Sequence, residues 1–78
     1  MKSIQVYGSG CQKCDQLKVE TEKALQLLGF SIEIDKVTDY ALILLAGVVS
    51  TPALSVDGKL IFQGEVKKAE EIKSLLSD

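Results

Sequence analysis

The sequence predicts an α/β fold in which a mixed four-stranded sheet is flanked by three helices, in the order β-α-β-α-β-β-α. Three observations support this prediction. Apolar residues recur every two residues in some segments and every three or four residues in others. Gly and Pro separate these segments, and one Asp-Gly pair lies between two short apolar runs. No linker, internal repeat or low-complexity tract divides the chain, so we expect residues 1–78 to form a single domain.

A first strand of about six residues is predicted near the start of the chain. Ile4 and Val6 alternate with Gln5 and Tyr7, and Gly8-Ser9-Gly10 then ends the strand in a tight loop. Gln5 does not fit the centre of such a sheet, because a central strand is covered on both faces.

A helix follows, because the apolar spacing changes to three and four from Cys11 onward. The predicted stripe contains Cys14, Leu17, Thr21, Ala24, Leu25 and Leu28. Ser9 and Gln12 have the spacing of a capping box, so we expect the helix to begin at Ser9 or Gly10. Gly29 is expected to end it in the left-handed conformation.

The middle of the chain predicts a strand and a short helix. Apolar and polar residues alternate over 30–35, which is typical of a half-buried strand. Thr38 or Asp39 can then cap a helix that runs to about Ala46. Because almost all of its side chains are apolar, this second helix is either buried on most sides or partly exposed for a partner, and of the two we expect burial.

The last third of the chain predicts a hairpin and a final helix. Asp57-Gly58 lies between Leu54 and Val56 on one side and residues 59–62 on the other, which indicates two antiparallel strands after Pro52. Helical spacing then returns at Val66, Ala69, Ile72, Leu75 and Leu76.

Charge and composition exclude several classes of function. Nine Lys plus Arg against eleven Asp plus Glu gives a net charge of −2, so no basic surface for nucleic acid is expected. The apolar run over 40–56 is interrupted by Gly47, Ser50, Thr51 and Pro52, so it does not predict a membrane span. No histidine is present, which excludes Ser-His and Cys-His nucleophilic sites. The first residues contain no apolar export segment, so we expect a cytoplasmic protein.

Cys11 and Cys14 are the candidate catalytic residues. A disulfide between these two residues would close a very short loop and contribute only about 2 kcal/mol to the stability of the fold. A purely structural role therefore does not explain their position. Residues i and i+3 of a helix are neighbours, so the two sulfurs can reach bonding distance. At the helix start, unpaired amides and the positive end of the dipole should lower the pKa of the Cys11 thiol. We treat the neighbouring Lys13 and Asp15 as solvated surface residues.

The motifs together resemble the small thioredoxin-like proteins of archaea and bacteria known as redox-active disulfide proteins. The resemblance rests on Gly8-Ser9-Gly10-Cys11-Gln12-Lys13-Cys14, on Ser50-Thr51-Pro52 and on Asp57-Gly58, and it covers essentially the whole chain. It implies a thioredoxin-like fold, Cys11 as the attacking thiol, Cys14 as the resolving thiol, and Pro52 in the cis form facing them.

The sequence also departs from two better-known branches of this fold. Gln12-Lys13 replaces the Gly-Pro that ordinary thioredoxins place between their cysteines, so their redox potential cannot be transferred to this chain. The stretch over 63–66 lacks the Gly-Gly-x-Asp type turn with which glutaredoxins hold glutathione.

The leading hypothesis is a thiol–disulfide oxidoreductase that needs no cofactor and works as a monomer. Its partners would be disulfide-containing protein substrates and an upstream disulfide reductase. The substrate chain would lie on a shallow surface formed by Val49, Ser50, Thr51, Pro52 and Gly10.

Two alternatives remain open. Cys-x-x-Cys also binds Cu(I) or Zn in small carrier domains, although these usually run β-α-β-β-α-β. Alternatively, the apolar stretch from Tyr40 to Val49 would serve a binding module in which the cysteines are incidental.

Overall fold

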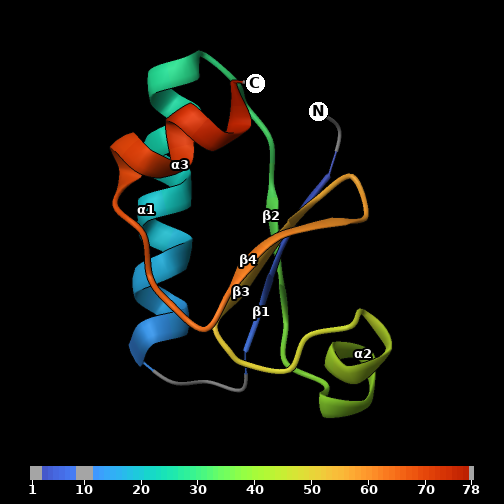
Figure 1. The fold of residues 1–78 in the computed structure, drawn as a ribbon. Helices are drawn as coiled ribbons and strands as arrows, with labels where there is room; N and C mark the ends of the chain where they lie inside the picture. The colour runs from blue at the N-terminus through green and yellow to red at the C-terminus, as the bar shows by residue number, and fades with distance from the viewer. Residues whose placement is uncertain (1–2, 9–11, 78) are drawn as a thin grey trace.

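The computed structural model describes residues 3–8 and 12–77, and within these ranges the chain forms four strands and three helices (Figure 1). In chain order the elements are β1 (Ile4–Tyr7), α1 (Gln12–Leu28), β2 (Ile34–Val37), α2 (Tyr40–Leu45), β3 (Ala53–Val56), β4 (Lys59–Gln63) and α3 (Ala69–Leu76). The strands lie in the order β2-β1-β3-β4, with β1 parallel to β2 and the other pairs antiparallel. The predicted α/β order and mixed sheet are therefore confirmed.

Two apolar clusters lie on the two faces of the sheet. Helices α1 and α3 cover one face, and α2 lies on the other (Figure 1). The first cluster contains Ile4, Val6, Leu17, Ala24, Leu25, Ile34, Leu54 and Ile72. The second contains Tyr7, Ile43, Val48 and Ala53. Because side chains alternate along a strand, β1 contributes to both clusters and is buried from both sides.

The position of Gln5 in the central strand has a structural explanation. Gln5 is paired with Ser55 on β3. This pair lies on the same face of the sheet as the pair formed by Tyr7 and Ala53 and is its next neighbour on that face. The Ser55 hydroxyl donates a 2.8 Å hydrogen bond to Oε1 of Gln5, and the Tyr7 hydroxyl lies 3.5 Å from the same Ser55 oxygen. The short helix α2 packs on this face of the sheet near Tyr7. Gln5 and Ser55 lie further along the same face, where their mutual hydrogen bond satisfies both polar side chains.

The second strand begins later than the sequence predicts. We expected a strand over 30–35, whereas β2 spans Ile34–Val37. Gly29 has a φ of 79°, and the Phe30 amide donates to the Leu25 carbonyl at 2.9 Å, so the chain is still closing α1 at this point. Pairing starts only where Ile34 meets Ile4, and the alternation before it belongs to a connection.

The second helix is capped as predicted but is not buried as predicted. The Asp39 carboxylate accepts a 2.9 Å hydrogen bond from the Ala41 amide. Among the described residues of α2, Ile43 is buried, while Tyr40, Leu42, Leu44 and Leu45 are 53–83 % exposed. Fewer than two helical turns present only one side chain to the sheet, so the expectation of burial on most sides was wrong.

The hairpin has the predicted turn. Asp57 and Gly58 have φ values of 51° and 83°, as the two central residues of a type I′ turn require. Asp57 also binds Ser3. The Ser3 amide donates a 2.8 Å hydrogen bond to the Asp57 carboxylate, and the Asp57 amide donates a 2.9 Å hydrogen bond to the Ser3 carbonyl. In the ranges that the structure describes, no helix is long and apolar enough to cross a membrane.

Helix α3 packs on α1 and takes its N-terminal cap from it. Lys68, the residue that precedes α3, makes no side-chain cap hydrogen bond in the described structure. Instead, Glu20 of α1 accepts a 3.1 Å hydrogen bond from the Ala69 amide. This bond, with help from Lys23, holds the pKa of Glu20 below its ordinary value of 4.5.

Candidate functional site

The described candidate residues gather at one end of the sheet, where β1 ends and β3 begins. Cys14 lies in the first turn of α1 and is fully buried. Val49, Ser50 and Thr51 are exposed in the connection from α2 to β3, and Pro52 is buried directly before β3. Cys11, Gly10 and the helix start expected at Ser9 or Gly10 lie outside the described residues.

The Thr51-Pro52 peptide bond is cis, as the family resemblance implied. The fold brings this bond to the end of the sheet where α1 begins, because β1 and β3 are antiparallel neighbours. Tyr7, the last residue of β1, is paired with Ala53, the residue after Pro52.

Gly8 lies close to both Cys14 and Thr51. A Cβ atom at Gly8 would overlap the Cys14 sulfur, and it would lie 3.1 Å from Cβ of Cys14 and 3.9 Å from Cβ of Thr51. The Gly8 amide donates a 3.0 Å hydrogen bond to the Val37 carbonyl, which fixes its backbone beside β2. The missing side chain therefore makes the space that the buried sulfur of Cys14 occupies.

Sequence reasoning placed Gly8 in the loop before the helix but did not predict its contact with Cys14. Gly8 does not have a positive φ, unlike Gly29, Gly47, Gly58 and Gly64. The requirement for glycine is steric, and it comes from a residue on the following helix. The available signal was a glycine between the end of the first strand and the Cys-x-x-Cys motif, three residues before Cys11.

A second missed residue is Gln63, at the end of β4. Its side-chain Oε1 accepts hydrogen bonds from the amides of Val49 and Ser50, at 2.7 and 3.1 Å. The next residue, Gly64, donates its amide to the Pro52 carbonyl at 2.9 Å. The loop that leads into β3 is thus hydrogen-bonded to Gln63 and Gly64 at the end of β4.

An ion pair joins α1 to β2 next to the cysteine. The Lys36 ammonium contacts the carboxylate of Asp15, the residue after Cys14. Asp15 is largely exposed, as expected, and it also pairs with a half-buried lysine of the sheet, which the sequence did not predict. The pair places one positive and one negative charge beside the first turn of α1.

A metal centre has no support among the described side chains. Within residues 3–8 and 12–77, no three His, Cys, Asp or Glu side chains are grouped so that they could hold an ion. The described elements follow the order β-α-β-α-β-β-α, which differs from the β-α-β-β-α-β order that is usual for the carrier domains considered above.

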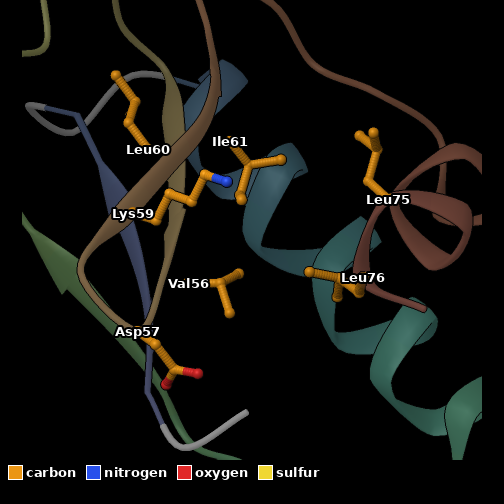
Figure 2. Close-up of a pocket in the computed structure, with 7 residues that line it drawn as sticks. All are labelled: Val56, Asp57, Lys59, Leu60, Ile61, Leu75 and Leu76. Carbon is orange, nitrogen blue, oxygen red and sulfur yellow. The ribbon is translucent and has the colours of Figure 1, made fainter. Parts of the chain in front are cut away.

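A pocket of about 500 Å³ lies at the other end of β3, away from Cys14. Figure 2 shows Val56 and Ile61 of the hairpin on one side of it and Leu75 and Leu76 of α3 on the other. Asp57 and Lys59 lie at the turn. This pocket contains none of the predicted site residues, so the candidate site is the surface around Cys14 and the 49–52 loop.

Comparison with known proteins shows which family the sequence matches. A family model described as a thioredoxin domain matches residues 2–77. A thioredoxin of Methanothermobacter thermautotrophicus is 42 % identical over 77 residues, which cover 99 % of this chain and 100 % of that protein. A thioredoxin of Methanocaldococcus jannaschii is 40 % identical over 76 residues, covering 97 % and 87 %.

A solved structure shares the fold at much lower sequence identity. It is thioredoxin-2, described as a component of the malaria parasite's protein secretion machinery. It matches with a TM-score of 0.68 and 19 % identity, over 96 % of this chain and 82 % of the other. Similarity at this level shows the fold alone.

Proposed function

This chain belongs to the thioredoxin domain family, and from that premise we propose that it is a thiol–disulfide oxidoreductase which uses Cys11 and Cys14 to reduce protein disulfides. The observation that carries the proposal is the placement of Cys14. Its sulfur is buried against Gly8 at the start of α1, beside the connection that contains Thr51 and Pro52. A buried thiol in this position suits the second, resolving step of an exchange reaction.

The proposed reaction proceeds in two exchanges. The Cys11 thiolate attacks one sulfur of a substrate disulfide, forming a mixed disulfide and releasing the other substrate sulfur as a thiolate that takes up a proton. The Cys14 sulfur, after losing its own proton, then attacks Cys11 and displaces the remaining substrate sulfur. The substrate gains two electrons and two protons, and the protein is left with a Cys11–Cys14 disulfide. An upstream disulfide reductase would return it to the dithiol.

Reduction of insulin, with dithiothreitol as the electron source, tests this proposal. We expect the wild type to accelerate the reaction and Cys11→Ser to abolish the acceleration, because the attacking thiol is gone. Cys14→Ser should instead accumulate a mixed disulfide that mass spectrometry detects, because the second exchange is blocked. Activity that survives in Cys11→Ser would reject the assignment.

A binding module is the second candidate, and the exposed apolar side chains of α2 favour it. Tyr40 and Leu45 are 70 % and 83 % exposed, and Val49 in the adjoining loop is 85 % exposed. Replacing both cysteines by serine separates the two functions. Partner capture that is unchanged in this variant, together with absence of insulin reduction in the wild type, would favour the binding module.

A further inference from the structure

One side-chain oxygen satisfies two consecutive backbone amides in the loop before Pro52. Oε1 of Gln63 accepts from Val49 at 2.7 Å and from Ser50 at 3.1 Å. An amide oxygen has two lone pairs, so both hydrogen bonds can be made at the same time. Val49 and Ser50 are themselves exposed.

The backbone next to Gln63 anchors the same loop at its other end. The Gly64 amide donates to the Pro52 carbonyl at 2.9 Å. Gly64 has a φ of 81°, and a Cβ atom there would lie 3.2 Å from Cβ of Ser50. Thr51, which lies beside Gly8 and Cys14, is therefore held between an anchor at Val49 and Ser50 and an anchor at Pro52.

We infer that Gln63 is a positioning residue, which holds the 49–51 loop in place beside Cys14 so that a polypeptide disulfide can bind there. The inference rests on the proposed function and adds to it a residue that lies on another strand. Because the loop amides of Val49 and Ser50 are directed at Gln63, they are not offered to the substrate. The substrate meets the exposed side chains of Val49, Ser50 and Thr51 instead.

The inference predicts an effect on substrate binding and not on cysteine chemistry. A loop that is already ordered does not lose conformational freedom when the substrate binds. Without the Gln63 acceptor, the loop must be ordered at that moment, which weakens binding of any substrate that relies on it. A small disulfide that reaches the cysteines without touching the loop should react unchanged.

The experiment compares Gln63→Leu, Gln63→Asn and Gln63→Glu in the full chain. For a synthetic disulfide peptide, Gln63→Leu should raise KM about tenfold with kcat unchanged, because two hydrogen bonds are lost. Gln63→Asn should behave similarly, since its oxygen is withdrawn by one methylene. Gln63→Glu should stay within about twofold of wild type, because a carboxylate oxygen accepts from the same two amides.

Two further measurements identify the cause. Amide hydrogen exchange at Val49 and Ser50 should become faster in Gln63→Leu and remain slow in Gln63→Glu. The reaction rate with an aromatic small-molecule disulfide should be the same in all variants. The matched control is Gln5→Leu, which also removes a hydrogen bond from the sheet but lies away from the loop, and it should leave the peptide KM unchanged.

The outcomes separate this inference from the proposed function. An inactive wild type refutes the proposed function, whatever the exchange data show. An active wild type whose Gln63→Leu and Gln63→Asn variants keep the wild-type peptide KM refutes the role of Gln63. A KM that rises equally in Gln5→Leu also refutes it, because the effect would then be general loss of stability.

Discussion

Gly8 makes the strongest residue-scale prediction, because its missing side chain leaves room for a sulfur. In Gly8→Ala the new methyl group would overlap the Cys14 sulfur and crowd its Cβ. We expect a loss of about 1–3 kcal/mol in the free energy of unfolding, as for other overpacked sites. Urea denaturation of the reduced protein measures it, and the rate of insulin reduction should fall in parallel.

A double-mutant cycle assigns this loss to the one contact. In Cys14→Ala the sulfur is absent and only the 3.1 Å approach to Cβ of residue 14 remains, so the loss caused by Gly8→Ala should become much smaller in that background. Gly29→Ala is the control, because among the described residues no atom outside its own chain neighbours lies within 4 Å of its Cβ position. Its φ of 79° makes it destabilising, but insulin reduction by the folded protein should be unchanged. Equal losses from Gly8→Ala in both backgrounds would contradict the steric explanation.

The residues of the site differ in how far the sequence could predict them. The spacing of Cys14 in its Cys-x-x-Cys motif already predicted its chemistry, and the cis bond at Pro52 was expected from the family resemblance. Gly8 and Gln63 act through contacts with other elements, on α1 and in the loop before β3. Their roles depend on how those elements pack, which no local pattern records.

At the scale of the elements, the start of α3 depends on a side chain of α1. Glu20 accepts from the Ala69 amide, and this bond lowers the pKa of Glu20 from its ordinary 4.5. A lowered pKa in the folded state means that the ionised carboxylate stabilises the fold. This contribution is fully present above pH 4.5 and is lost as the pH falls through the lower folded-state value.

Glu20→Gln is the variant that tests this linkage. It keeps an oxygen that can accept from Ala69 but removes the charge, so the urea midpoint should be lower than that of wild type at pH 7. The two midpoints should converge as the pH falls through the folded-state pKa of Glu20, which lies below 4.5. Glu22→Gln, on the exposed side of the same helix, is the matched control and should show a smaller difference. A gap between Glu20→Gln and wild type that is constant from pH 7 to pH 3 would contradict the assignment.

The elements that the sequence misjudged are those whose position depends on a neighbour. The alternation over 30–35 fits a strand, yet β2 begins at Ile34 because β1 offers its first partner there. The apolar composition of α2 suggested burial, but a helix of six residues reaches the sheet only through Ile43. By contrast, the turn at Asp57-Gly58 and the end of α1 at Gly29 are set by local backbone geometry, and both were predicted correctly.

At the scale of the whole molecule, the two faces of the sheet are unequally covered. The face under α1 and α3 holds the larger cluster, in which Ile72 is fully buried. The face under α2 holds a cluster of four buried residues, to which α2 itself contributes Ile43. Because α2 is anchored by so little buried surface, we expect it to open locally without unfolding the rest of the sheet.

Hydrogen exchange on two variants tests this division. Ile72→Ala removes about 3 kcal/mol from the larger cluster, so slow amides in α1, β1 and β3 should exchange roughly a hundredfold faster. Ile43→Ala should accelerate exchange mainly in α2, at amides such as Ala46, whose hydrogen bond to Leu42 belongs to that helix. Amides of β1 that respond equally to both substitutions would mean that the two faces unfold as one unit. If they respond only to Ile72→Ala, the apolar surface of α2 can rearrange beside the 49–51 loop while the sheet and α1, which carries Cys14, stay folded.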